Sequence, residues 1–226
     1  GGAAGGGKTD ALLVEAARDV DKAGYNSVLF RKTYPQLNAP GGIIQRSRQL
    51  YAAFAGAYGI GDRRWTFPSG ATVDFRHLKY SSNRYDWQGA QIACLIFDEL
   101  THFDEAEYVY MFSRCRSTAP GVRPRIRAGT NPGGRGHAWV KKRWGAWLDK
   151  DHEHPAKPGE LRWYKQVAGV DTETTADDPD GRSRPLLPPR VRWNPAHRAP
   201  DPAHLRGHQS AARPTRSGGR DANGEG

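Results

Sequence analysis

The chain lacks several features that would place it in other classes of protein. Its 226 residues contain no apolar run of the roughly 20 residues that cross a bilayer. No charged segment followed by an apolar one suggests a signal peptide. Only two cysteines are present, Cys94 and Cys115, too few for a disulfide framework or a zinc site, and both lie in apolar segments. We therefore expect a soluble intracellular protein with both cysteines in its core, and no membrane partner.

Acidic residues are scarcer than basic ones, but the excess of basic residues is unevenly distributed along the chain. The net charge is +10, which taken alone favours a polyanionic partner such as nucleic acid. Residues 182–226 hold nine arginines against three acidic residues, so +6 of that charge lies there. The body of the chain carries only the remaining +4. Charge alone therefore decides little about the partner.

The C-terminal part also lacks the residues that build a core. From Gly181 onward there are seven prolines and no Ile, Phe, Tyr or Met. Such a segment cannot bury enough apolar surface to fold, so we expect residues 177–226 to be a disordered tail. A basic tail of this kind could bind nucleic acid. We prefer a different interpretation, in which its composition reflects a GC-rich coding sequence translated out of frame. Residues 1–176 are long enough for one domain of ordinary size.

The chain opens on GGAAGGGKT, which matches the phosphate-binding pattern G-x-x-x-x-G-K-[ST]. Successive backbone N–H groups of such a loop can turn toward one anion, and the helix that follows adds the positive end of its dipole. Lys8 is expected to reach the β- and γ-phosphates, and Thr9 to place its hydroxyl on Mg²⁺. The loop glycines expected to contact the nucleotide are Gly2, Gly5, Gly6 and Gly7.

A flexible glycine-rich terminus is the alternative interpretation of this opening. It is disfavoured because the lysine and threonine are followed by an apolar spacing typical of a helix. The motif ordinarily follows a strand. Since no strand precedes the loop in this sequence, we expect a fragment truncated at its N-terminus.

Apolar patterning along the chain predicts alternating strands and helices. We expect strands at 25–33, 92–97, 125–130 and 161–167, and a hairpin at 64–77. Helices are expected at 43–58, 103–117 and 136–148. The run IACLIF is apolar without alternation, as in a central parallel strand covered on both faces. The pattern indicates an α/β fold with a mostly parallel central sheet.

Two carboxylates follow that central strand. Asp98 and Glu99 in LIFDEL would lie at the carboxyl edge of the sheet, where ligands bind in such folds. We expect Asp98 to hold Mg²⁺ alongside Thr9, and Glu99 to polarise the water that attacks the γ-phosphate. Asp10 is a rival carboxylate, but its place in the first turn of a helix favours a role in stabilising that turn.

A third polar element follows the strand IRAGT. Thr130 and Asn131, in GTNPGG, could sense the γ-phosphate and relay its loss to the next segment, although a plain turn explains the sequence equally well. The helix at 136–148 comes next and carries Lys141, Lys142 and Arg143, which could grip a phosphate backbone or simply form a solvated face.

Together these blocks resemble one protein family. GGAAGGGKTDALL, VLFRKTYPQL, WTFPSGATVDF, YDWQGAQIACLIFDELTHF and GTNPGGRGHAWVKKRW follow in the order seen in the large terminase subunits of tailed bacteriophages and prophages. The resemblance implies a RecA-like (ASCE) P-loop NTPase of three layers that uses ATP and Mg²⁺ to pump double-stranded DNA into a procapsid. It implies a homo-oligomeric ring in the bacterial cytoplasm, with the small terminase subunit and the portal protein as partners. By the same resemblance Gly2–Thr9 is the nucleotide loop, Asp98 and Glu99 the metal and catalytic carboxylates, and Thr130-Asn131 the coupling motif.

The chain also departs from the family pattern. We expect it to lack the adenine-binding segment upstream of the loop and the C-terminal nuclease domain of the family, and Ala3 and Ala4 stand where some relatives carry an arginine. A charge-stabilising arginine must then come from elsewhere. Arg84 is the first candidate, and Arg114 and Arg116 are others. Two alternatives stay open, another RecA-like or helicase-like P-loop ATPase and an inactive, truncated prophage remnant.

Overall fold

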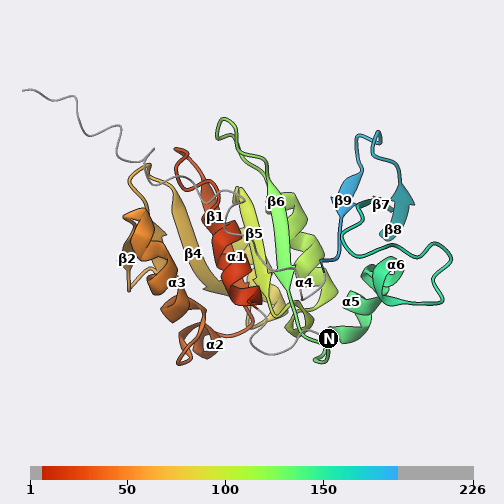
Figure 1. Ribbon diagram of the computed structural model, residues 1–226, viewed down its shortest axis with the longest axis horizontal. Helices are drawn as coiled ribbons and strands as arrows, with labels where there is room; N and C mark the ends of the chain where they lie inside the picture. The colour runs from red at the N-terminus through yellow and green to blue at the C-terminus, as the bar shows by residue number, and fades with distance from the viewer. Residues whose placement is uncertain (1–6, 188–226) are drawn as a thin grey trace, which may run out of the picture.

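The fold is mixed α/β and contains two β-sheets (Figure 1). The computed structural model describes residues 7–187. The strands of the larger sheet are β1 (Asn26–Arg31), β2 (Ala57–Gly59), β3 (Arg64–Thr66), β4 (Thr72–His77), β5 (Cys94–Asp98) and β6 (Arg125–Gly129). The strands of the smaller sheet are β7 (Arg162–Val167), β8 (Val170–Thr174) and β9 (Arg182–Arg184).

The larger sheet runs in the order β2-β3-β4-β1-β5-β6 and is mostly parallel, as the sequence predicts. β1 pairs in parallel with β4 and β5, and β5 with β6, whereas β2 and β3 are antiparallel additions. All five residues of β5 are buried, as expected for a continuous apolar strand. The register pairs Phe30 with Phe97 and Asp98 with Gly129, so the carboxyl ends of β1, β5 and β6 meet at one edge.

Helices cover both faces of this sheet. The α-helices are α1 (Lys8–Ala16), α2 (Tyr34–Asn38), α3 (Ile43–Tyr51), α4 (Glu105–Tyr110), α5 (His137–Arg143) and α6 (Gly145–Leu148). The 3₁₀ helices are η1 (Ala52–Phe54), η2 (Ser81–Trp87), η3 (Leu100–His102) and η4 (Met111–Arg114). Leu29 and Ile96 pack in the core beneath α1 and α3, while Phe30 and Phe97 pack in a second core with α4 and α5. Successive side chains of each strand thus point to opposite faces of the sheet, and the helices on both faces give the expected three layers.

The helix expected at 43–58 is shorter than predicted. α3 ends at Tyr51, and after η1 the chain turns into β2. Ala55 adopts the left-handed region with φ 54°, and a Cβ at Gly56 would come within 2.9 Å of the Phe67 ring. The close approach to buried aromatic rings of the hairpin therefore ends the helix. The cause is a long-range contact that local periodicity does not reveal.

The basic helix expected at 136–148 is two helices that meet at Trp144. Its three cations also differ in accessibility: Lys141 and Lys142 are exposed, but Arg143 is only 7% exposed. Arg143 Nη1 lies 2.9 Å from Asp171 Oδ2, and its guanidinium stacks over Phe112. Arg143 therefore anchors the smaller sheet and is not available to bind DNA.

The structure describes a strand beyond the domain boundary that the sequence predicts at residue 177. The strand expected at 161–167 is present as β7, but it pairs antiparallel with β8 and β9 in the smaller sheet. β9 follows residue 177, and Asp178 forms an ion pair with Lys165 at 2.7 Å. The part of the predicted tail that the structure describes, residues 177–187, therefore contains a strand. The disorder expected for 188–226 lies outside the described residues.

Both cysteines are free thiols. Cys94 is fully buried in β5, and burial raises the pKa of its thiol. Cys115 is half-buried, and burial raises its pKa to about 11. Their expected role in core packing is confirmed. No helix within residues 7–187 is long and apolar enough to cross a membrane.

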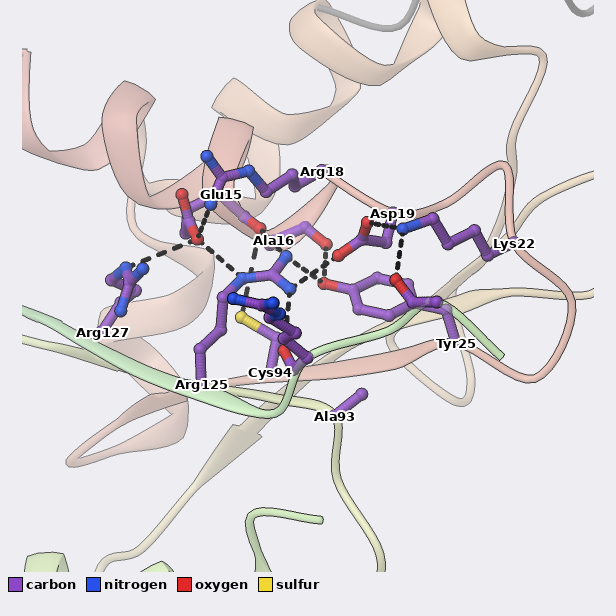
Figure 2. A network of polar contacts seen from close by, with 12 residues as sticks. Glu15, Ala16, Arg18, Asp19, Lys22, Tyr25, Ala93, Cys94, Arg125 and Arg127 are labelled. Carbon is purple, nitrogen blue, oxygen red and sulfur yellow. Dashed lines mark hydrogen bonds and ion pairs between the residues drawn. The ribbon is translucent and has the colours of Figure 1, made fainter. Parts of the chain in front are cut away.

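A polar network fixes α1 against β6 (Figure 2). Arg125 Nε lies 2.7 Å from Glu15 Oε1, and its Nη1 lies 2.6 Å from Asp19 Oδ2. Lys22 pairs with Asp19 at 2.6 Å, also within the network. Burial raises the pKa of Asp19, but the hydrogen bonds from Lys22 and Arg125 outweigh it and leave that pKa below its usual value. This network holds the C-terminal end of α1 in a fixed position on the sheet.

We expect Arg125→Ala to lower the free energy of unfolding by about 3 kcal/mol, because it leaves two largely buried carboxylates without their shared partner. Arg18→Ala is the matched control. Arg18 pairs with the same Glu15 but its side chain is 57% exposed, so its loss is expected to cost less than about 1 kcal/mol. Urea unfolding of the three proteins measures both values. Equal losses for the two variants would show that the network does not hold α1.

Candidate nucleotide-binding site

The glycine-rich opening leads into α1 as the sequence predicts. Gly2, Gly5 and Gly6 lie outside the described residues, so the site begins at Gly7. Gly7 adopts the left-handed region with φ 71° and caps α1, and as a glycine it offers the helix no side-chain cap. The first N–H groups of α1 are thus left to a ligand or water.

The two residues after Gly7 have different surroundings. Lys8 is half-buried, and its Nζ donates a hydrogen bond to Oδ1 of Asn131, 123 residues further along the chain. Thr9 is half-buried on the same turn. Asp10 points elsewhere: its two carboxylate oxygens accept from Arg46 of α3 at 2.6 and 2.8 Å, and the Arg46 hydrogen bond lowers the pKa of Asp10. Asp10 therefore joins two helices rather than serving this edge.

Asp98, at the end of β5, is buried against an arginine of the neighbouring strand. Arg31 donates to Asp98 Oδ2 from Nε at 2.8 Å and from Nη2 at 2.6 Å. Asp98 is only 3% exposed, and burial raises its pKa despite the opposing charge of Arg31. The sequence motifs assigned no role to Arg31. Its position at the end of a strand next to β5 was the available signal, but that signal requires knowing the strand order.

Glu99 follows Asp98 and has an unusual backbone. Its φ of 59° and ψ of 59° place it in the left-handed region, which is uncommon for a non-glycine residue and typical of functional sites. The carboxylate accepts the backbone N–H of Asn131 at 3.3 Å and the side-chain Nδ2 at 3.1 Å. Asn131 therefore contacts both Lys8 and Glu99.

The loop after β6 is packed against the segment after Glu99. Thr130 and Thr101 hydroxyls lie 2.9 Å apart, and Gly136 N–H donates to the Thr101 carbonyl at 2.8 Å. A Cβ at Gly136 would come within 2.5 Å of the Phe103 carbonyl oxygen, so only glycine permits this contact. The segment that carries Thr130 and Asn131 is a docked loop, more than the plain turn that the sequence left open.

A second ion pair lies beside the site. Lys32 Nζ is 2.7 and 2.9 Å from the two carboxylate oxygens of Glu107, which is fully buried on α4. The Ser81 hydroxyl also donates to Glu107 at 3.2 Å. The sequence did not reveal this pair, because neither residue belongs to the phosphate-binding loop or to the carboxylate motif. It ties the carboxyl end of β1 to α4.

Arg84 is not brought to this cluster. Its guanidinium donates to the Ser81 carbonyl at 3.0 Å and to the Tyr85 hydroxyl at 2.8 Å, and it stacks over the Tyr85 ring at 4.6 Å. The structure therefore brings Lys8, Glu99, Thr130 and Asn131 together at this edge. Asp98 directly precedes Glu99, at the end of β5. It leaves Arg84 on η2, among its own neighbours.

The groups at this edge suit a magnesium nucleotide. Apart from Gly7 and its chain neighbours, no atom within residues 7–187 lies within 4 Å of the place that a Cβ on Gly7 would take, so the start of α1 has open space beside it. No cluster of three His, Cys, Asp or Glu residues in that part of the chain could hold a metal by itself. Mg²⁺ characteristically takes one or two protein oxygens and completes its shell with phosphates and water. Thr9 and Asp98 supply oxygens of that kind.

A match to a family model agrees with the family resemblance of the sequence. The family model for the N-terminal part of T4-like virus terminase large subunits matches residues 1–199. The large terminase of a thermophilic bacteriophage (crystal form 2) has 22% identity and a TM-score of 0.49, over 64% of this chain and 35% of that one. The ADP complex of the same terminase (crystal form 3) has 18% identity and a TM-score of 0.48, over 66% and 36%. The chain thus spans about a third of those structures, and no curated protein matches it.

The raised pKa of Asp98 predicts how stability depends on pH. A carboxyl whose folded pKa exceeds its unfolded value of about 3.9 contributes least at neutral pH and more as pH falls through the folded pKa. We expect the stability of the unmodified chain relative to Asp98→Asn to rise as pH falls from neutral, in urea unfolding at a series of pH values.

Asp10→Asn is the matched control, because the pKa of Asp10 is lowered. A lowered pKa gives a contribution that is present above the unfolded value and is lost as pH falls through the folded one. The two variants should therefore show pH dependences of opposite sign. The same sign for both would contradict the assigned environment of Asp98.

Proposed function

The chain belongs to the family of T4-like terminase large subunits, in their N-terminal part, and from this we propose that it is the ATPase unit of a motor that translocates double-stranded DNA into a viral procapsid. The observation that carries the proposal is the chain of contacts Lys8–Asn131–Glu99. It links the lysine of the phosphate loop to the carboxylate best placed to activate water. Such a link would allow a change at the phosphate loop to reach the segment after β6.

Each residue at the edge receives a role in the proposed reaction. Gly7 and the start of α1, together with Gly2, Gly5 and Gly6, would hold phosphate oxygens through backbone N–H groups. Thr9 and Asp98 would hold Mg²⁺, which when bound neutralises charge on the β- and γ-phosphate oxygens. Lys8 would exchange the side-chain oxygen of Asn131 for phosphate oxygens.

Glu99 would act as the general base. Its carboxylate would accept a proton from water as the water oxygen bonds to the γ-phosphorus and the bond to the bridging oxygen breaks, with ADP as leaving group. Asn131 holds that carboxylate through two hydrogen bonds. Since Lys8 is the other partner of Asn131, exchange at Lys8 would alter the orientation of Glu99 and shift the Thr130–Gly136 loop.

The partners follow from the family. We extend the proposal to a homo-oligomeric ring that engages double-stranded DNA, the small terminase subunit and the portal protein in a bacterial host. Arg84 stays the candidate for an arginine that stabilises charge, supplied to the site of a neighbouring subunit, since in its own chain it stacks on tyrosines. The ATPase unit would comprise residues 1–187, with β9 included.

We expect Glu99→Gln to bind ATP and Mg²⁺ normally but to turn over roughly 10²–10⁴-fold more slowly, because the amide keeps the shape and cannot accept a proton. Binding is measured with a fluorescent ATP analogue and turnover by phosphate release. Glu153→Gln, an exposed glutamate outside the site, should change neither.

Lys8→Ala should abolish ATP binding, because it removes the charge that would hold the β- and γ-phosphates. Substitution of the exposed Lys150 by Ala is the control and should leave ATP binding unchanged. A chain that does not bind ATP before any substitution would support the inactive remnant and refute the proposal. Glu99→Gln with unchanged turnover would refute only the role of Glu99.

DNA contact is assigned to the exposed cations of α5. Phosphate contacts give affinity without sequence preference, and each one lost lowers the slope of log K against log salt by about 0.9 for duplex DNA. We expect Lys141→Ala with Lys142→Ala to flatten that slope by about 1.8 equally across sequences and to leave DNA-free ATPase unchanged. Arg143 is left intact because it is buried.

The matched control is Lys150→Ala with Lys157→Ala, which removes the same charge from exposed positions outside α5. It should leave the slope unchanged if α5 is the contact. An equal effect of both pairs would indicate general attraction to the basic chain. An unchanged slope for the α5 pair would assign those lysines to solvent.

A further inference from the structure

Thr101 is a buried threonine to which the sequence motifs assign no role, and it lies two residues after Glu99. It belongs to the 3₁₀ helix η3 and is only 2% exposed. Its hydroxyl oxygen is 2.9 Å from the Thr130 hydroxyl and 3.2 Å from the Asn131 carbonyl oxygen. Its backbone N–H also donates to the Thr130 hydroxyl at 3.2 Å. The polar atoms of this buried residue are thus directed to the loop that follows β6.

The two threonine hydroxyls share one acceptor, the carbonyl oxygen of Asn131. The Thr130 hydroxyl lies 3.0 Å from this oxygen, so the three oxygens form a closed set of contacts. Each hydroxyl has a single proton. One hydroxyl can therefore donate to the carbonyl while the other donates to the first hydroxyl, and the roles can be exchanged. In both arrangements the hydroxyl of Thr101 connects η3 to the backbone of Asn131.

We propose that Thr101 is a positioning residue for the proposed hydrolysis, and that its hydroxyl holds the backbone of Asn131 so that Asn131 keeps the Glu99 carboxylate in place. The inference rests on the proposed function and extends it to a residue outside the motifs. The Asn131 carbonyl is held by the two hydroxyls, while its N–H and its side-chain nitrogen donate to Glu99 at 3.3 and 3.1 Å. A shift of this backbone would displace both hydrogen bonds to Glu99.

The segment that contains Glu99 and Thr101 is itself held in place. Glu99 adopts the left-handed region with φ 59°, a conformation that a non-glycine residue keeps only when the surrounding structure fixes it. The Thr101 carbonyl accepts the Gly136 N–H at 2.8 Å, and the Phe103 carbonyl accepts Nε1 of Trp139 at 2.9 Å. The proposed base and the residue that positions its partner therefore lie on one short, fixed segment.

The loop after β6 is attached to this segment by bonds of two kinds. At Asn131 the attachment is made by side-chain hydroxyls, whereas at Gly136 it is made by backbone groups. A Cβ at Gly134 or Gly136 would come within 2.9 Å of the Thr101 carbonyl oxygen, so the loop backbone lies directly against Thr101 there. Loss of the Thr101 hydroxyl should therefore loosen the loop at Asn131 and leave it docked at Gly136.

The first test follows amide hydrogen exchange in the chain without ATP. Thr101→Val keeps the shape of the side chain and removes its hydroxyl, whereas Thr101→Ser keeps the hydroxyl. We expect Thr101→Val to speed exchange at Asn131 by about tenfold, as for the loss of one hydrogen bond, and to leave exchange at Gly136 nearly unchanged. Thr101→Ser should resemble the unmodified chain at both amides.

The second test measures ATP turnover by phosphate release with the same variants. Thr101 contacts neither Lys8 nor the start of α1, so Thr101→Val should lower kcat by roughly tenfold and change KM for ATP little. Thr101→Ser should restore kcat. A merely structural role for Thr101 would not produce this difference between kcat and KM or this rescue.

Ser47→Ala is the matched control for the loss of a buried hydroxyl. Ser47 is fully buried on α3, where its hydroxyl donates to the Ile44 carbonyl at 2.7 Å and accepts from Trp65 Nε1 at 3.0 Å. These contacts lie outside the candidate site. Ser47→Ala should therefore lower stability to urea and change neither kcat nor exchange at Asn131.

Three results would overturn the proposal. Equal acceleration of exchange at Asn131 and Gly136 in Thr101→Val would mean that the hydroxyl holds the whole loop, which is a structural role. Unchanged exchange at Asn131, or unchanged kcat despite faster exchange, would mean that the hydroxyl does not position Glu99. The same loss of kcat in Thr101→Ser or Ser47→Ala would assign the effect to general destabilisation. Absence of turnover in the unmodified chain would instead refute the proposed function, and exchange at Asn131 would still decide whether Thr101 holds it.

Discussion

The candidate site depends on the side-chain amide of Asn131, which contacts two functional groups at once. Its oxygen accepts a hydrogen bond from Lys8 and its nitrogen donates to Glu99 at 3.1 Å. These contacts require β6 to end level with β5, as the pairing of Asp98 with Gly129 provides, and α1 to stay fixed on β6, as Arg125 provides. A shift of one residue in the register would move Asn131 away from both partners. Distant packing thus sets the geometry of the edge.

The parts of the fold that the sequence predicted are those that local patterns encode. The apolar run before Asp98 identified β5 and therefore the edge at which its two carboxylates lie, because continuous burial needs no knowledge of neighbours. The motif GGGKT identified Lys8 because it, too, is a local pattern that can be recognised without knowing the strand order. The pair Arg31–Asp98 was not predictable, because it arises only once β1 lies beside β5. The strand order, rather than the spacing along the chain, brings those charges together.

The burial of individual basic residues in α5 was likewise not predictable from the local sequence. Lys141, Lys142 and Arg143 are consecutive and chemically alike, yet the first two are exposed and the third is buried against Asp171. A buried arginine is tolerated only when a carboxylate and further contacts compensate it. Here the compensating acid comes from β8, in a second sheet that the sequence did not separate from the first. No pattern within the helix distinguishes the three cations.

The charges at the edge differ in what a ligand must displace. Arg31 is held by Asp98 at 2.6 Å and Lys32 by Glu107 at 2.7 Å, so an anion would have to compete with a carboxylate for either cation. Within residues 7–187, Lys8 contacts no carboxylate, and its partner is the neutral oxygen of Asn131. The bond from Lys8 to Asn131 has one ionised partner, whereas a bond from Lys8 to a phosphate oxygen would have two and would add the attraction of opposite charges. Lys8 would therefore exchange its bond to Asn131 for a stronger bond to an incoming phosphate, so of these three cations it is the one that is available for exchange.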